Sequence, residues 1–298
     1  MILAVAALAS QTARAQGGDS LLALGRVAAA ESAFYAAAAT RPRDPGPRAR
    51  LGQFIALRGG TRAGAILLEE ARQFGGDSVM IALALAPLYA RLGDYKAIAA
   101  LEPSPLTPDE RARATYLASS PTRVVFRDSV VRVPYRAGRA AGLGTVLLRV
   151  ARTELSAVID PAISGLVLPA TMRAEVRIFG DTTSGVGVVS VRVGSQTFEN
   201  VPVTLAVGDE PVRIGFDVFQ MFSPTFDPRA GRIALRRPER RWRPGAGTRV
   251  PALYGEGGML LLFNGVWTSS SSPNAAQLLS ARAWTWDARR GDVVLLTP

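Results

Sequence analysis

The side chains of this chain that could do chemistry are carboxylates, hydroxyls and amines, because two of the usual catalytic residue types are missing. The 298 residues contain no cysteine and no histidine, and Lys96 is the one lysine among 35 basic residues. Thiol nucleophiles, disulfides, cysteine–histidine zinc sites and every serine–histidine–aspartate arrangement are therefore excluded. Lys96 also lacks the preceding glycine-rich run of a phosphate-binding loop. We expect no metal and no cofactor.

One aspartate stands where a strand-forming run meets a turn. The run Val158–Asp160 is followed by Pro161 and Ala162, and a second apolar run ends at Pro169. This stretch resembles the active-site strand and turn of the retropepsin-like aspartic proteases, a family with one lobe in each chain.

The resemblance continues downstream at a second glycine turn. Ile214, Gly215 and Asp217, followed by a hairpin at residues 226–235, look like the family's second turn, short helix and final hairpin. In order and spacing the resemblance covers roughly residues 129–238. It implies that Asp217 and the hairpin's Asp227 are structural polar groups, not an acid–base pair or metal ligands.

The resemblance also implies that Asp160 stands at the position of the catalytic carboxylate. In the family, Asp-Thr-Gly or Asp-Ser-Gly triplets meet, usually across a dimer axis, so that two carboxylates share a proton and activate a water. Here Pro161 supplies neither a hydroxyl nor an N–H, and Ala162 adds a Cβ in place of glycine. We therefore predict a protease-like domain without peptidase activity. The alternative is an active homodimeric endopeptidase that uses Asp160 from each subunit.

Three glycines mark a hairpin that could cover a groove. Gly180, Gly185 and Gly187 lie in the segment 179–193, which is similar in place to the family's flap. A groove under such a hairpin offers backbone hydrogen bonds and side-chain pockets to an extended peptide without any chemistry. We expect peptide binding there, with an ordinary surface hairpin as the alternative.

The elements that must position these residues are short strands, which begin at Arg123. Runs rich in β-branched residues predict strands at 130–135, 145–150, 155–160, 186–193 and 201–207. Residues 122–238, called the barrel below, are therefore expected to form an all-β, retropepsin-like barrel. With the helices that precede it, the fold class is multidomain α + β.

A periodic pattern precedes the barrel. Gly25, Gly59 and Gly93 recur at intervals of 34 residues, because 59 − 25 and 93 − 59 are both 34. The same interval joins Phe34 with Leu68, Leu51 with Leu85, Ala37 with Ala71 and Ile55 with Tyr89. A helix pair of this length is similar to the tetratricopeptide repeat. We predict such a helical repeat over residues 17–105, which either binds a peptide or protein partner, or serves as a spacer or packs on the next domain.

Residues 239–298, called the tail, contain the turn-rich segment 244–247, which looks like a hinge. Strands are predicted at 259–263 and within 283–296, with a helical stretch near 273–279 between them. The tail is therefore expected to be a β-rich extension of the barrel.

Part of the barrel is echoed in the tail. The segment Phe226–Leu235 matches Trp286–Leu295 in its aromatic–aspartate start, its glycine and its final apolar run. About sixty residues are too few for a second complete barrel with its own aspartate turn. We therefore expect a hairpin that extends the sheet or covers the dimer edge, in preference to the remnant of a second lobe.

The N-terminus has features of a signal peptide. Ile2–Ala9 is apolar, and Ala13-Arg14-Ala15 gives the small–x–small pattern that precedes a cleavage site near Gln16. No basic region precedes Ile2, so a buried helix or a misassigned start is the alternative. We expect residues 1–16 to be removed, no membrane span in the rest, and a periplasmic or secreted protein.

The net charge of +11 could attract an anionic partner. The densest arginine cluster, at residues 236–243, is interrupted by prolines and a glutamate and has no aromatic stacking platform beside it. We therefore expect a protein or peptide partner and no nucleic acid. A third alternative is an envelope protein attracted to anionic lipid, whose binding would be lost at high salt.

Overall fold

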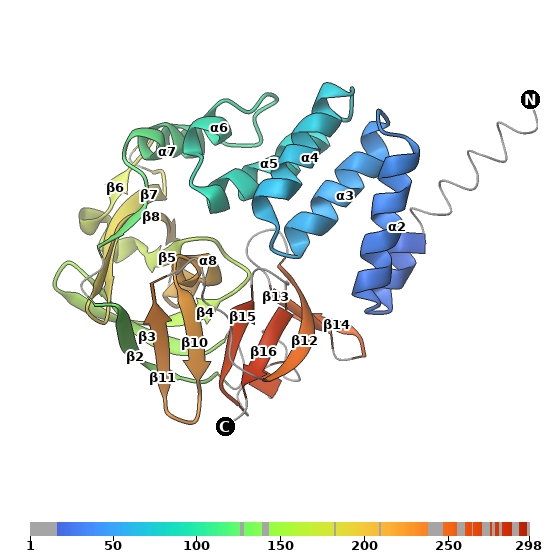
Figure 1. Ribbon diagram of the computed structural model, residues 1–298. Coiled ribbons are helices and arrows are strands. Elements are labelled where there is room, and N and C mark those ends of the chain that lie inside the picture. The colour runs from blue at the N-terminus through green and yellow to red at the C-terminus, as the bar shows by residue number, and fades with distance from the viewer. Residues whose placement is uncertain are drawn as a thin grey trace, which may run out of the picture.

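The chain consists of N-terminal helices packed over a C-terminal β-barrel with extra strands (Figure 1). The computed structural model describes residues 17–125, 128–138, 143–181, 183–208, 210–237, 247–254, 260–263, 265–269, 275, 278–279, 282–287 and 292–296. The predicted signal peptide lies outside the described residues, as do most of the arginine cluster and part of the predicted 273–279 helix.

The helices begin at polar caps that the sequence supplies. After a helical stretch at residues 17–23 come α2 (Val27–Thr40), α3 (Pro45–Leu57), α4 (Thr61–Gln73), α5 (Ser78–Leu92), α6 (Tyr95–Ala99) and α7 (Pro108–Ser119). The carboxylates of Asp44, Asp77 and Asp94 accept backbone N–H groups at the starts of α3, α5 and α6. Thr107 and Glu110 form a capping box at the start of α7.

The 34-residue interval corresponds to a structural interval. Gly25, Gly59 and Gly93 all have positive φ, at 69°, 87° and 69°, and each follows the first helix of a pair. The matched residues Phe34 and Leu68 are 2% and 0% exposed. Successive helix pairs therefore bury equivalent positions, while the assignment to the tetratricopeptide family stays a prediction.

The barrel strands agree closely with the predicted runs. They are β1 (Arg123–Val125), β2 (Val130–Arg136), β3 (Thr145–Val150), β4 (Thr153–Asp160), β5 (Leu166–Pro169), β6 (Arg177–Ile178), β7 (Val186–Val193), β8 (Gln196–Ala206), β9 (Arg213–Gly215), β10 (Ser223–Asp227) and β11 (Arg232–Arg236). A 3-10 helix, Ala170–Glu175, follows β5, and the short α8 (Phe216–Gln220) follows β9. The eleven-residue β8 begins five residues before the predicted run 201–207.

The tail adds β12 (Gly247–Tyr254), β13 (Leu260–Phe263), β14 (Trp267–Ser269), β15 (Trp284–Asp287) and β16 (Asp292–Leu296). Within the predicted 273–279 helix, the described residues Ala275, Leu278 and Leu279 are helical. Strand β15 pairs antiparallel with β10, with Phe226 opposite Trp284. The tail therefore extends the sheet of the barrel, as one of the two predicted arrangements required.

The strand order shows that the tail repeats part of the barrel. The two halves correspond when the order is read outward from the pair of β15 with β10. On the tail side it runs β15-β16-β12-β13-β14, and on the barrel side it runs β10-β11-β2-β3-β4. Thr225 lies opposite Thr285 at the centre. Arg132-Val133-Pro134 and Arg249-Val250-Pro251 occupy equivalent registers on either side. The tail is thus a shortened internal copy of five barrel strands, which is more than the single hairpin expected from the sequence.

Barrel and tail share one hydrophobic core, whereas the helical repeat has two clusters of its own. Aromatic rings fill the core at the β10–β15 junction, where Phe226 and Trp284 are stacked with their centroids 4.2 Å apart. Phe216 at the start of α8 packs against both rings. The α8 turn is therefore anchored to the barrel and to the tail together.

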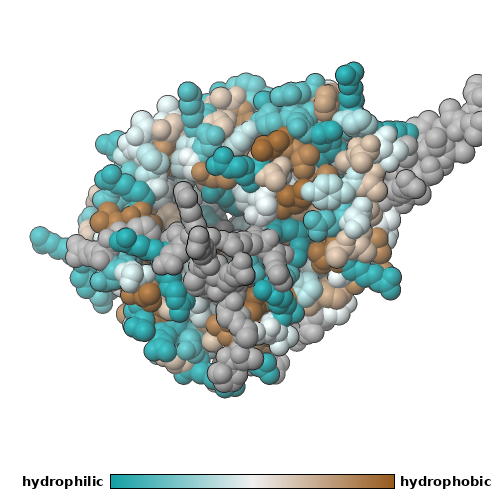
Figure 2. All heavy atoms as spheres, in the orientation of Figure 1, coloured by the Kyte–Doolittle hydropathy of each residue, from teal (hydrophilic) through white to brown (hydrophobic). Residues whose placement is uncertain are grey.

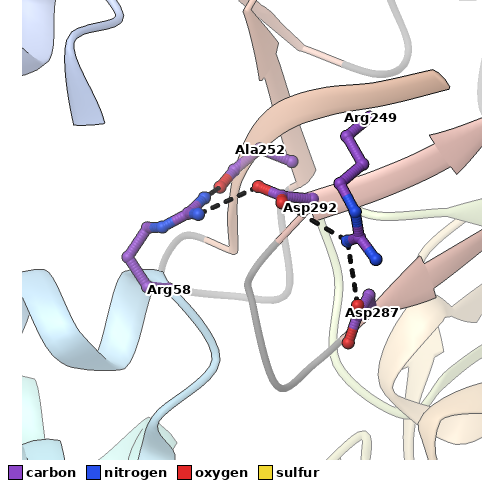
Figure 3. A network of polar contacts seen from close by, with 5 residues as sticks. All are labelled: Arg58, Arg249, Ala252, Asp287 and Asp292. Atoms are coloured by element: carbon purple, nitrogen blue, oxygen red, sulfur yellow. Dashed lines mark hydrogen bonds and ion pairs between the residues drawn. The ribbon is translucent and has the colours of Figure 1, made fainter. Parts of the chain in front are cut away.

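Polar contacts fix the helical repeat to the tail. Arg58, at the end of α3, donates from Nη1 to the Ala252 carbonyl at 2.6 Å and from Nη2 to Asp292 Oδ1 at 2.9 Å (Figure 3). On the other side of Asp292 from Arg58, the Arg249 guanidinium lies 3.0 Å from the Asp287 carboxylate and 3.6 Å from the Asp292 carboxylate. Trp267 Nε1 also donates to the Leu22 carbonyl at 2.6 Å. These contacts favour the alternative in which the repeat packs on the β structure of its own chain.

Candidate functional site

The Asp160 turn is positioned by three neighbouring strands. Strand β9 lies between β4 and β5, parallel to β4 and antiparallel to β5. The register sets Ile214 beside Ile159 and Gly215 beside Asp160. A Cβ at Gly215 would stand 2.6 Å from the Ile163 carbonyl oxygen, so this position requires glycine. The two predicted turns are therefore brought together.

The Asp160 carboxylate is engaged within its own chain. Oδ1 accepts the Ala162 backbone N–H at 2.9 Å, and Oδ2 lies 3.4 Å from Arg213 Nη1. Arg213 also donates from Nη2 to Glu210 Oε2 at 2.9 Å. The Asp160 side chain is 17% exposed. Among the described residues, an amide and a guanidinium are thus the partners of the Asp160 carboxylate.

The two residues that follow Asp160 differ in burial. Pro161 is buried, and Ala162 is exposed with its backbone outside the left-handed region. The Ala162 Cβ therefore reaches solvent without strain, while its amide still caps Asp160. Within the described part of the chain, the Asp160 carboxylate accepts no hydrogen bond from a hydroxyl.

Asp217 joins the two turns from the α8 side. Its carboxylate accepts the Ser164 hydroxyl at 2.6 Å and the amides of Gly165, at 3.1 Å, and Val218, at 3.0 Å. Desolvation raises the pKa of this carboxyl, against the opposing effects of the three donors and of the Arg91 charge. Because its oxygens accept hydrogen bonds from three groups of its own chain, Asp217 stabilises the conformation of the turn. Asp227 does the same in the β10–β11 hairpin, where it accepts the Ala230 amide at 3.0 Å.

The hairpin predicted as a flap is covered by a helix that the sequence analysis did not assign. A Cβ at Gly180, whose φ is +90°, would collide with the Asp109 carboxylate at the start of α7. The Tyr116 ring of α7 lies 5.3 Å from the Phe179 ring, and Arg177 is 4.8 Å above Tyr116. Gly185 and Gly187 allow close approach to β8 and β6. In this structure the hairpin is therefore docked on α7.

Two features of the site escaped the sequence analysis. Arg213 is two residues before Gly215, but its proximity to Asp160 depends on the parallel pairing of β4 with β9. Helix α7 carries a clear sequence signal, since Thr107 and Glu110 have capping-box spacing directly around Pro108. That signal could have identified the helix, although not its contact with the hairpin.

The composition of the described residues limits other kinds of site. No group of three or more acidic side chains among them could hold a metal ion. In the same part of the chain, no helix is long and apolar enough to cross a bilayer.

The comparisons with known proteins give matches among solved structures alone. No protein-family model matches the chain, and no curated protein matches it. Among solved structures, it is similar to a retropepsin-like aspartic protease from Rickettsia conorii. The match has 14% sequence identity, a TM-score of 0.26, and covers 39% of this chain and 93% of that one.

Proposed function

We propose that this is an exported, protease-like protein without peptidase activity that binds a protein or peptide partner. The observation that carries the proposal is the state of the Asp160 carboxylate, whose oxygens accept the Ala162 amide and face the Arg213 guanidinium. A carboxylate already engaged by a cation of its own chain must give up that contact before it can pair with a second carboxylate. Pro161 adds a rigid neighbour that cannot donate a hydrogen bond.

The tail supports the same proposal. If the chain resembles retropepsin-like proteases, an active site needs a second copy with its own aspartate across an axis. Here β15 pairs with the edge of β10 that a second copy would need, and the tail repeats the strand order of the barrel. A second copy could not pair at that edge without displacing β15. The tail thus stands in for a partner barrel and makes the homodimeric endopeptidase the weaker alternative.

Binding is supported by surfaces that the chain leaves open. On the face seen in Figure 2, hydrophobic residues gather over helices α4 and α5. The large exposed apolar side chains of those helices are Ile66, Val79, Met80, Leu83 and Leu92. Exposed apolar side chains gathered on neighbouring helices are typical of protein interaction sites. The helical repeat can therefore receive a partner on this side while its other side packs on the tail.

The catalytic part of the proposal is tested with unfolded protein substrates from about pH 3 to about pH 7, the range in which aspartate dyads titrate. We expect no cleavage by the purified protein or by its Asp160→Asn variant. Fragment masses measured over time give the readout. Cleavage by the natural sequence that disappears in Asp160→Asn would establish the endopeptidase instead.

The same samples are examined by analytical ultracentrifugation. A monomer is expected, because β15 occupies the edge of β10. A stable dimer whose interface maps to the barrel by hydrogen exchange would contradict the argument from the tail, whatever the result of the cleavage assay.

Export is proposed from residues 1–16 alone, since their pattern is that of a signal peptide. Expression of the full sequence in a bacterium with a periplasm should give mature protein that begins near Gln16. N-terminal sequencing of the periplasmic and cytoplasmic fractions tests this. Full-length protein found wholly in the cytoplasmic fraction would reject export without affecting the other proposals.

A further inference from the structure

A cavity of about 530 Å³ lies where the helical repeat, the barrel and the tail meet. Its walls come from α5, α6 and α7, from the Ser164–Gly165 turn with the start of α8, and from Tyr254 at the end of β12. The volume is within the usual range of small-ligand pockets, about 300–1,000 Å³. Asp160 is not among the lining residues, although Asp217 and the Ser164–Gly165 turn are, so the cavity lies on the other side of the turns that hold Asp160 from its carboxylate's recorded partners, Ala162 and Arg213.

The Tyr254 hydroxyl in this cavity has no hydrogen-bond partner among the described residues, although the residue is 2% exposed. A buried polar group left without a partner is destabilising, so such groups are rare in native proteins. Burial raises the pKa of this tyrosine, with the nearby Asp217 charge adding to the effect and Arg91 opposing it. The group is therefore a neutral phenol that can donate one hydrogen bond and accept another.

The carboxylates that line the cavity are already satisfied by the chain. Asp217 accepts the donors of the Ser164–Gly165 turn and of α8. Glu110 accepts the Thr107 amide and hydroxyl, both at 2.9 Å. A cationic ligand would have to compete with these bonds. The cavity is therefore poorly suited to an amine.

The cationic side chains that line the cavity have N–H groups that could bind a ligand. Arg113 Nη1 donates to the Val203 carbonyl at 3.3 Å, and this is the hydrogen bond recorded for its guanidinium among the described residues. Burial lowers the pKa of Arg113, partly offset by the Glu110 charge. A desolvated guanidinium with unused N–H groups favours a carboxylate, which it can bind through two parallel hydrogen bonds. Arg91 adds a second positive charge, 4.2 Å above the Tyr254 ring.

Most of the remaining wall residues are apolar, although Thr61, Tyr95 and Thr122 also line the cavity. The apolar ones include Pro87, Ile98, Leu106, Leu117, Val218 and Met221. We propose that this cavity binds an apolar ligand with one carboxylate, which is held by the Arg113 guanidinium and the Tyr254 hydroxyl. Two sources share this chemistry: the C-terminal residue of a peptide with an apolar side chain, and a free aliphatic acid. With a peptide the inference rests on the proposed binding function and names its ligand, whereas a free acid does not need it.

The test uses the full chain and isothermal titration calorimetry with two matched pairs of probes. One pair is the peptide acetyl-Val-Leu-Phe with a free carboxylate and the same peptide with a C-terminal amide. The other is octanoate and octanol. We expect at least one acid to bind about tenfold or more tightly than its neutral counterpart, since a charge-assisted hydrogen bond is worth about 1.5–3 kcal/mol. Preference for the peptide or for octanoate identifies the source.

Two variants locate the binding. Tyr254→Phe removes only the hydroxyl and Arg113→Met removes the guanidinium, and each should weaken binding of the acid by about fivefold or more. Matched controls are Tyr35→Phe, at an exposed tyrosine, and Arg111→Met, on the same helix as Arg113. The proposal is overturned if neither acid binds, if acid and neutral probe bind equally, or if Tyr254→Phe binds as the natural sequence does. None of these results depends on the cleavage assay, so the two proposals fail separately.

Discussion

Replacing Trp284 with alanine is expected to lower the free energy of unfolding by about 3–5 kcal/mol, the usual range for removing a large buried aromatic side chain. Trp284 is fully buried, and its ring is stacked 4.2 Å from Phe226 with an angle of 8° between the planes. It belongs to the tail, while Phe226 belongs to the barrel, so the cavity would open at their shared core. Urea denaturation followed by circular dichroism measures the change.

Trp284→Phe is the matched control. Phenylalanine keeps a ring against Phe226 and removes the indole N–H, which has no partner among the described residues. The smaller cavity and the loss of an unsatisfied donor act in opposite directions, so a loss of about 1 kcal/mol is expected. Equal losses for the two variants would contradict the view that ring stacking joins the tail to the barrel.

The features that could be predicted from the sequence are those set by neighbouring residues. The strand 145–150 follows from its β-branched residues, and the hairpin at 226–235 from its tight turn and the family resemblance; both lie where expected. The positions of Gly25, Gly59 and Gly93 after first helices follow from the 34-residue interval. Local propensity and long-range packing agree at these points, so a pattern in the sequence is sufficient.

The pairing of distant strands could not be predicted in the same way. The match between residues 226–235 and 286–295 indicated a repeated hairpin, but the reversed strand order appears only when β12 and β2 are compared in register. The Arg-Val-Pro triplets at 132 and 249 are too short to be noticed without that register. The prediction of a single added hairpin therefore underestimated the tail, which has five strands.

The candidate site divides along the same line. The sequence placed Asp160, Pro161 and Ala162 in a turn and Gly215 in a second one, because each turn is local. It could not indicate that Arg213 would neutralise Asp160, since that contact is made between parallel strands 53 residues apart. The cavity at Tyr254 depends on three separate parts of the chain and has no local signature at all.

The junction between the helical repeat and the tail depends on the Arg58 guanidinium. The side chains of Arg58 and Asp292 are 17% and 15% exposed, so their attraction is little screened by water or salt. Arg58 also satisfies the Ala252 carbonyl of β12. Losing the guanidinium would leave a carbonyl and part of a carboxylate without donors at a partly buried interface, although Arg249 still faces Asp292 at 3.6 Å.

Arg58→Met, which keeps most of the side-chain length without the charge, is therefore expected to lower the free energy of unfolding by about 2 kcal/mol. This is below the roughly 3–5 kcal/mol for one partner of a fully buried pair, because Asp292 keeps Arg249. Arg149→Met is the matched control, since Arg149 pairs with Glu154 with both side chains about half exposed; it should cost at most about 1 kcal/mol.

Because the repeat has its own hydrophobic clusters, the weakened junction should also let its helices unfold at lower urea concentration than the β core. Equal effects of the two substitutions, with a single unchanged transition, would mean that the polar junction does not hold the repeat on the tail.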